Sequence, residues 1–248
     1  MHIPTVTADQ MREVDRLMEE TYGISLLQMM ELAGRNLADL ARAQLNGSVV
    51  ERSIIVAAGR GNNGGGGLVA ARHLVNWGAA VTILVESAQE LSRAPRAQWE
   101  SLKHLPLGWH EGEPARRFLH QARADLIIDA LIGYGLRGDP RGWVAGMIDQ
   151  INALARSVLA LDVPSGLDAT TGRPGTPCIN ASTTMTLALP KAGLLQAEAR
   201  PFVGNLYLAD IGVPSELYSR LGLNVGPIFR RCSVISLDTE ISEIGDGD

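Results

Sequence analysis

The sequence predicts a doubly wound α/β fold, in which helices cover both faces of a parallel sheet. From residue 53 onward, short and continuously apolar runs alternate with amphipathic segments, and such runs are typical of strands buried on both faces. No linker rich in proline, glycine or serine and no internal repeat interrupts this alternation. The pattern therefore favours one domain over residues 1–237.

Two helices are expected before the first strand. Thr7 and Gln10 fit the two ends of a capping box, and apolar residues follow at helical spacing from Met11. A second amphipathic pattern covers residues 26–45. We expect the first helix to begin directly after Thr7.

The apolar runs at 54–58, 81–85, 126–128, 158–161 and 185–189 are the expected strands. A glycine-rich loop, residues 59–67, joins the first of them to a helical stretch at 68–77. Residues 238–248 are acidic with little to bury, which predicts a disordered tail. In open parallel sheets ligands bind beyond the carboxyl ends of the strands, so polar residues at those ends are the candidate site residues.

The charge composition of the chain indicates which class of molecule the protein binds. The formal net charge of −5 and pI near 5.6 argue against nucleic-acid or membrane-surface binding, which needs a basic surface, and favour small molecules. The N-terminus has neither a signal-peptide pattern nor a membrane span, so a cytoplasmic location is expected. Cys178 and Cys232 are expected to be reduced structural thiols, since no metal-ligand spacing surrounds them.

The segment from Gly59 to Gly67 is predicted to hold a phosphate. Glycines let the backbone approach an anion, and the following helix N-terminus presents free N–H groups and a positive dipole end. A flexible turn is the alternative. Gly59, Gly61 and Gly64, with Glu86 further on, also match a dinucleotide-binding dehydrogenase pattern, whereas no Lys-Ser/Thr follows as a Walker A loop requires.

Acids stand at two further strand ends. Asp129 precedes a second glycine-rich turn containing Arg137, which can bind phosphate, and Asp162 precedes a Pro-Ser-Gly turn. Each acid alone could be an ordinary turn residue. With Asn63 and Ser165 they supply the hard oxygen ligands that suit an alkali or alkaline-earth cation.

A lysine follows the last apolar run. Lys191 and Lys103 are the only lysines of the chain. A buried lysine at this position could donate a proton or contact phosphate. A surface lysine with an extended stem is the alternative.

Segments along most of the chain match a known family. They are MMELAGR at 29–35, GRGNNGG at 59–65, DALIGYGLRGD at 129–139, LDVPSGLDATTG at 161–172 and TLALPKAGLL at 186–195. In this order they resemble the NAD(P)H-hydrate epimerase family, also called the YjeF N-terminal domain family. The resemblance implies a Rossmann-like three-layer α/β/α sandwich with a mostly parallel central sheet.

The resemblance also implies an activity and a site. The expected protein is an isomerase of nicotinamide nucleotide repair, a stand-alone epimerase module and homodimer that interconverts the R and S forms of NADHX and NADPHX. Potassium would bind Asn63, Asp129 and Ser165. The hydrate would bind Asn62, Asn63, Gly64, Gly65, Gly66, Gly133, Tyr134, Gly135, Leu136, Arg137, Gly138, Asp139 and Asp162, with Asp162 and Lys191 as the catalytic pair.

One position departs from the family pattern. The family loop reads GNNGGDG, and Gly66 stands where that pattern has its aspartate. Two alternatives follow from the lost carboxylate. The chain could be a catalytically impaired nucleotide-binding or scaffold protein, or a related enzyme that acts on another small substrate.

Overall fold

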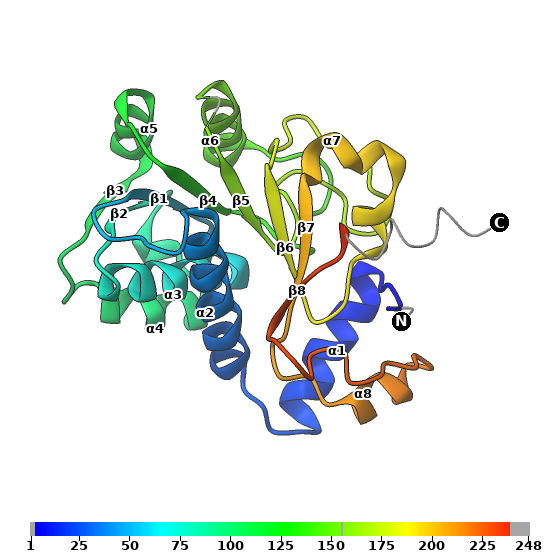
Figure 1. The fold of residues 1–248 in the computed structure, drawn as a ribbon. Coiled ribbons are helices and arrows are strands. Elements are labelled where there is room, and N and C mark those ends of the chain that lie inside the picture. Colours follow the sequence, from blue (N-terminus) through cyan, green and yellow to red (C-terminus); the bar gives the residue numbers. More distant parts are fainter. Residues whose placement is uncertain (1–2, 155, 239–248) are drawn as a thin grey trace.

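The computed structural model describes residues 3–154 and 156–238, and it confirms the predicted α/β fold (Figure 1). A single eight-stranded sheet has the order β3-β2-β1-β4-β5-β6-β7-β8. Every neighbouring pair is parallel except β7 with β8. The strands are β1 (Ser53–Ala58), β2 (Ala80–Val85), β3 (Gly108–Glu111), β4 (Leu126–Ala130), β5 (Val158–Leu161), β6 (Thr183–Leu187), β7 (Asn205–Ala209) and β8 (Val234–Ser236).

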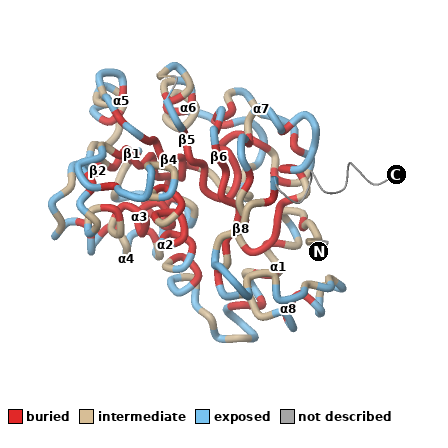
Figure 2. Tube along the Cα trace, viewed as in Figure 1, coloured by how far each residue is buried: buried red, intermediate tan, exposed pale blue. Residues whose placement is uncertain are grey.

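Helices cover both faces of this sheet, which makes the three layers. They are α1 (Ala8–Glu20), α2 (Leu26–Gln44), α3 (Asn62–Asn76), α4 (Arg93–Leu102), α5 (Gly112–Gln121), α6 (Gly142–Ala153), α7 (Arg200–Val203) and α8 (Ser215–Arg220), with short 3₁₀ turns at Ala88–Glu90, Ala192–Leu195 and Ala197–Ala199. Ile54 and Val56 pack with α2, α3 and α4, whereas Ile55 and Ala57 pack with α5 and α6 on the opposite face. Burial on both faces explains the continuously apolar strands (Figure 2).

The N-terminal helices confirm the capping prediction. Thr7 Oγ1 accepts from the Gln10 amide at 3.2 Å, and Gln10 Oε1 accepts from the Thr7 amide at 2.9 Å. Just before this cap, Val6 pairs with Lys191 as an isolated parallel bridge. The bridge sets α1 against the segment that follows β6.

The predicted loop at 59–67 is wrong from Asn62 onward, because α3 already begins there. The glycines inside α3 serve close packing. A Cβ on Gly65 would lie 2.5 Å from Met30 Sδ, and one on Gly67 would lie 2.5 Å from Ala130 Cβ. Helix α3 therefore sits unusually near both α2 and the sheet.

Other boundaries also differ from the prediction. Strand β4 continues through Asp129 to Ala130, and β6 ends at Leu187 instead of residue 189. Three edge or late strands, β3, β7 and β8, were not predicted, because they are short or partly exposed and lack a continuous apolar run. Beyond Asp238, the predicted acidic tail lies outside the described residues. The Asp238 side chain itself accepts from the Leu206 amide at 2.8 Å.

The structure also bears on the state of the two cysteines and on membrane-spanning helices. Cys178 is buried, Cys232 is exposed, and neither forms a disulfide. Within residues 3–154 and 156–238, no helix is both long and apolar enough to cross a bilayer.

Candidate active site

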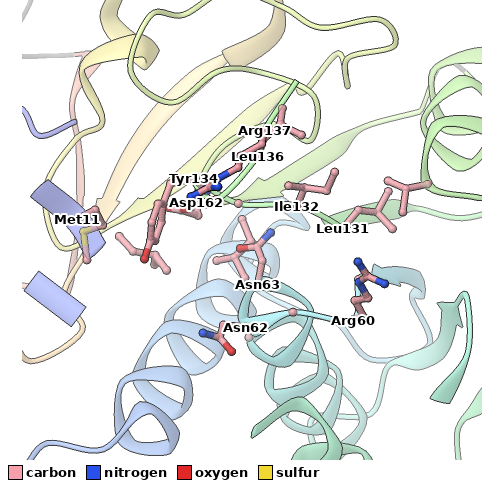
Figure 3. Close-up of a pocket in the computed structure, with 18 of the residues that line it drawn as sticks. Met11, Arg60, Asn62, Asn63, Leu131, Ile132, Tyr134, Leu136, Arg137 and Asp162 are labelled. Carbon is pink, nitrogen blue, oxygen red and sulfur yellow. Dashed lines mark hydrogen bonds between the residues drawn. The ribbon is translucent and has the colours of Figure 1, made fainter. Parts of the chain in front are cut away.

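A cavity of about 930 Å³ opens at the carboxyl ends of the central strands (Figure 3). The strand order reverses between β1 and β4, with α3 on one face and α6 on the other. In doubly wound folds this reversal creates the crevice where ligands bind. The volume lies within the range of small-molecule and cofactor sites.

Asp162 sits in this cavity in a strained backbone conformation. Its φ is 70°, in the left-handed region that few residues other than glycine adopt, and its side chain is buried. Asp162 Oδ2 accepts from the Tyr134 amide at 2.8 Å, while Oδ1 lies beside a charged side chain. Strain of this kind is retained where the surrounding structure needs one side-chain direction.

Lys191 is the ionic partner of Asp162. Its Nζ lies 2.5 Å from Asp162 Oδ1 and donates to the Leu187 carbonyl at 2.9 Å. Lys191 is 0% exposed, so the alternative of a surface lysine is wrong. A buried charge of this kind is tolerated only with a partner, and the Asp162 carboxylate is that partner.

Tyr134 and Asp15 border the same pair. The Tyr134 hydroxyl donates to Asp15 Oδ2 at 2.5 Å, and Lys191 Nζ lies 5.8 Å from the centre of the Tyr134 ring. Burial raises the pKa of Asp15, an effect that the Tyr134 hydrogen bond and the Lys191 charge oppose. Burial, followed by the Asp15 carboxylate, also raises the pKa of Tyr134, so the phenol keeps its proton and remains a donor.

The N-terminus of α3 forms the floor of the cavity beside these residues. Asn62, Asn63 and Gly66 line it, and Figure 3 shows Asn63 below Asp162. Asn63 Nδ2 is buried without a partner among the described residues. A Cβ on Gly66 would lie 2.8 Å from Leu161 Cδ2, which also lines the cavity. Free N–H groups at this helix end favour an anionic ligand.

Asp129 and Ser165 are buried and do not line the cavity, but they bond to the amides of Leu131 and Ile132, which do. Asp129 accepts from the Ser165 amide at 2.8 Å, the Ser165 hydroxyl at 2.6 Å and the Leu131 amide at 3.1 Å. Burial raises the pKa of Asp129 to about 6 even though these hydrogen bonds lower it. None of its described contacts is a positively charged side chain.

These residues fit an alkali cation. The buried carboxylate of Asp129 lacks a countercharge among its contacts, and the Ser165 hydroxyl and the Asn63 amide supply further oxygens. No three His, Cys, Asp or Glu side chains converge within the described ranges, so a transition-metal site of that type is not formed there. Amide, carboxylate and hydroxyl oxygens are hard ligands that match a cation such as potassium.

The turn after β4 closes one side of the cavity. Of the predicted hydrate contacts in this turn, the lining residues are Gly133, Tyr134, Gly135, Leu136, Arg137 and Asp139. Gly138 lies outside the lining, as do Gly64 and Gly65 in α3. Asp139 Oδ1 accepts from the Thr176 amide at 3.0 Å, which anchors the turn.

Several lining residues were missed by the sequence analysis. Asp15 comes from α1, and Arg12, Arg60 and Arg141 add positive charge around the cavity. A signal for Asp15 was present, because it directly follows buried Val14 on an amphipathic helix. The arginines carry no such signal. Their charge suits a ligand with phosphate groups.

Fold and cavity together define a doubly wound α/β protein with a site of small-molecule or cofactor size at the strand-order reversal. Residues 26–193 match the family model described as YjeF-related protein N-terminus. The chain belongs to this family, as the sequence resemblance predicted.

Curated relatives are similar over most of the chain. An NAD(P)H-hydrate epimerase of Dehalogenimonas lykanthroporepellens is 42% identical over 221 residues, which cover 89% of this chain and 87% of the relative. An NAD(P)H-hydrate epimerase of Truepera radiovictrix is 37% identical, with 88% of this chain and 94% of the relative covered.

Longer relatives and a solved structure complete the comparison. The bifunctional NAD(P)H-hydrate repair enzyme Nnr of Moorella thermoacetica is 38% identical over 88% of this chain, which spans 42% of that protein. The crystal structure of yeast ynu0 has a TM-score of 0.81 at 24% identity and covers 95% of this chain and 100% of its own. That structure supports the fold.

Proposed function

We propose that the chain is an NAD(P)H-hydrate epimerase that interconverts the R and S forms of NADHX and NADPHX. The observation that carries the proposal is the buried Asp162–Lys191 pair in a cavity of small-molecule or cofactor size. Relatives that are named for this activity are similar over nearly the whole chain. The site supplies an anion-binding helix end, cationic side chains and a proton-transfer group together.

The proposed chemistry takes place at C6 of the hydrated nicotinamide ring. The hydroxyl leaves as water after it receives a proton, while the lone pair of the ring nitrogen yields a planar cation. Water then adds to either face and loses a proton. Lys191 is the proton source for the leaving hydroxyl, and Asp162 takes the proton of the adding water and returns it to Lys191, whose Nζ lies 2.5 Å from Asp162 Oδ1. While it is protonated, Lys191 also acts as the electrostatic partner of the carboxylate.

Binding is assigned to the cavity walls. The hydrate phosphates approach Asn62, Asn63 and Gly66 at the N-terminus of α3, with Arg137 on the opposite turn. Potassium would be held by Asn63, Asp129 and Ser165. When bound there, it supplies positive charge beside the phosphates.

The comparisons favour the epimerase over the alternatives raised by Gly66. Epimerases at 37% and 42% identity are similar over more than four fifths of this chain. Gly66 still lines the cavity, and its missing side chain leaves Leu161 undisturbed. We therefore propose that Gly66 changes the rate of an epimerase that is still active.

The test uses a single purified epimer of NADPHX and follows both diastereomers by chromatography. We expect interconversion well above the spontaneous rate, and Asp162→Asn should lower kcat by about 10² to 10⁴ because a proton-transfer group is lost. Asp149→Asn, on the exposed side of α6, is the matched control and should retain the rate. Gly66→Asp should change the rate.

Two outcomes would contradict these assignments. Interconversion by the wild-type protein at only the spontaneous rate would sink the epimerase function. Equal rates for Gly66→Asp and wild type would show that the lost carboxylate at position 66 does not affect the rate.

We further infer a homodimer, as the family resemblance implies, and the expected cytoplasmic location stays a prediction. Met29, Met30 and Leu37 are buried within the single chain, so they are core residues. The exposed Leu27 and Leu32 on α2 are apolar side chains that remain for contact with a second copy.

A further inference from the structure

Helix α1 contributes an acid to the site although it precedes the family match at 26–193. Asp15 lines the cavity and accepts the hydroxyl hydrogen bond of Tyr134, a residue 119 positions away in the sequence. Asp9 and Glu13 on the same helix instead pair with Arg12 and Arg16 at the surface. Asp15 therefore faces inward, toward the reactive pair.

The hydrogen bond fixes one end of Tyr134, and Asp162 holds the other. The Tyr134 amide donates to Asp162 Oδ2 at 2.8 Å, and the ring lies beside Lys191 at 5.8 Å, within cation–π range. A movement of Tyr134 would thus displace a donor to Asp162 and the neighbour of Lys191 together. Tyr134 therefore contacts both members of the pair, Asp162 through its backbone amide and Lys191 through its ring.

Hydrogen bonds hold the start of the helix that carries Asp15. The Val6 amide donates to the Pro190 carbonyl and the Ala192 amide donates to the Val6 carbonyl, each at 2.9 Å, on either side of Lys191. The Ala8 amide donates to Thr170 Oγ1 at 3.1 Å. The start of α1 is therefore tied to the segment that carries Lys191.

A contribution to folding stability does not explain the buried carboxyl of Asp15. It raises the pKa of Asp15, so the ionised form is less favourable in the folded chain than in water. Arg12 and Arg16 are adjacent on the helix surface, yet the Asp15 hydrogen bond goes to a neutral phenol. An acid that is buried in the wall of a cavity and bonded to a neutral phenol is a candidate functional residue.

We propose that Asp15 is a positioning residue of the reaction, which holds Tyr134 so that its amide orients Asp162 and its ring flanks Lys191. The proposal rests on the epimerase function assigned above. Asp15 acts through Tyr134 and does not itself transfer the proton.

The experiment measures kcat and KM on a single NADPHX epimer for Asp15→Leu, Asp15→Asn, Tyr134→Phe and the double variant Asp15→Leu/Tyr134→Phe. Asp15→Leu removes the acceptor, so kcat should fall about ten- to a hundredfold, as for a misplaced catalytic group, while KM changes far less. Asp15→Asn keeps an acceptor oxygen and should recover part of the loss. In the Tyr134→Phe background, Asp15→Leu should have no further effect.

Asp9→Leu is the matched control, since Asp9 lies on the same helix with its side chain 90% exposed, and it should keep the wild-type kcat. Equal kcat for Asp15→Leu and Asp9→Leu would overturn the proposal, and so would full additivity with Tyr134→Phe. If Asp15→Leu fails to fold, Asp15→Asn, Tyr134→Phe and their double variant form the same double-mutant cycle and test the proposal. An inactive wild-type protein would instead refute the epimerase function.

Discussion

At the residue scale, the site depends on side chains held in unfavourable states. Asp162 has a left-handed backbone, Ala188 has a φ of 65° near Lys191, and Lys191 is fully buried. Each of these costs free energy, of order 1 to 3 kcal/mol for a strained backbone. Such costs persist where a fixed geometry is needed, which supports Asp162 and Lys191 as the reactive pair.

The raised pKa of Asp15 predicts how stability depends on pH. Its protonated form is favoured in the folded chain, so this contribution is full below the unfolded pKa and is lost as pH rises through the higher folded pKa. At neutral pH, Asp15→Asn should therefore be at least as stable as the wild type, and the two should converge under acidic conditions. Urea unfolding across a pH series measures this difference.

The groups around Asp15 set the sign of this prediction. They are Arg12 and Glu19 on α1, Tyr134 after β4, Asp162 after β5, Lys191 after β6 and Tyr218 on α8. Lower stability of Asp15→Asn at neutral pH would mean that Lys191 and Tyr134 outweigh burial. The pKa shift would then have the opposite direction.

At the element scale, α3 combines two roles in one glycine-rich stretch. Its first turn presents Asn62 and Asn63 to the cavity, and the glycines that follow allow close contact with α2 and β4. Only the first role was predicted from the sequence. The second depends on how near two helices approach, and residue types alone do not specify that distance.

Gly67→Ala tests the packing role. The new Cβ would lie 2.5 Å from Ala130 Cβ and 3.3 Å from Val56 Cγ1. Overpacking costs about 1 to 3 kcal/mol and should exceed the gain of up to about 1 kcal/mol from replacing a helical glycine. The free energy of unfolding, measured with denaturant, should therefore fall.

Gly135→Ala is the control for this substitution, because a Cβ there meets nothing within 4 Å. Its unfolding free energy should stay near that of the wild type. Equal stability of Gly67→Ala and Gly135→Ala would show that α3 can move away from the sheet without cost.

At the scale of the whole molecule, the sheet topology assembles the site from distant segments. The loops after β1, β4, β5 and β6 meet at one edge, and α1 is bridged to the last of them. A cation at Asn63, Asp129 and Ser165 would join three of these segments. Its binding should therefore stabilise the entire fold.

Potassium is expected to raise Tm relative to tetramethylammonium at equal ionic strength. Occupancy at about a hundred times Kd corresponds to roughly 2.7 kcal/mol, and each kcal/mol raises Tm by about 2 to 4 °C in a chain of this size. Asp129→Asn should lose the response, whereas Asp149→Asn should keep it. An identical Tm in both salts would exclude a folded-state potassium site.

The sequence by itself determined the fold class, the capped first helix and the strand ends that carry Asp129, Asp162 and Lys191. These features follow from local periodicity and from the rule that parallel strands end at one edge. Segments 59–65 and 129–139 also carried the family resemblance, which the comparisons confirm.

Only the tertiary structure decided which of these residues touch. It paired Lys191 with Asp162, buried Asp129 against Ser165 and brought Asp15 to Tyr134. It also started α3 within the glycines. The physical reason is that such contacts join residues far apart in the chain. Their distances depend on the packing of whole helices against the sheet, which local patterns do not encode.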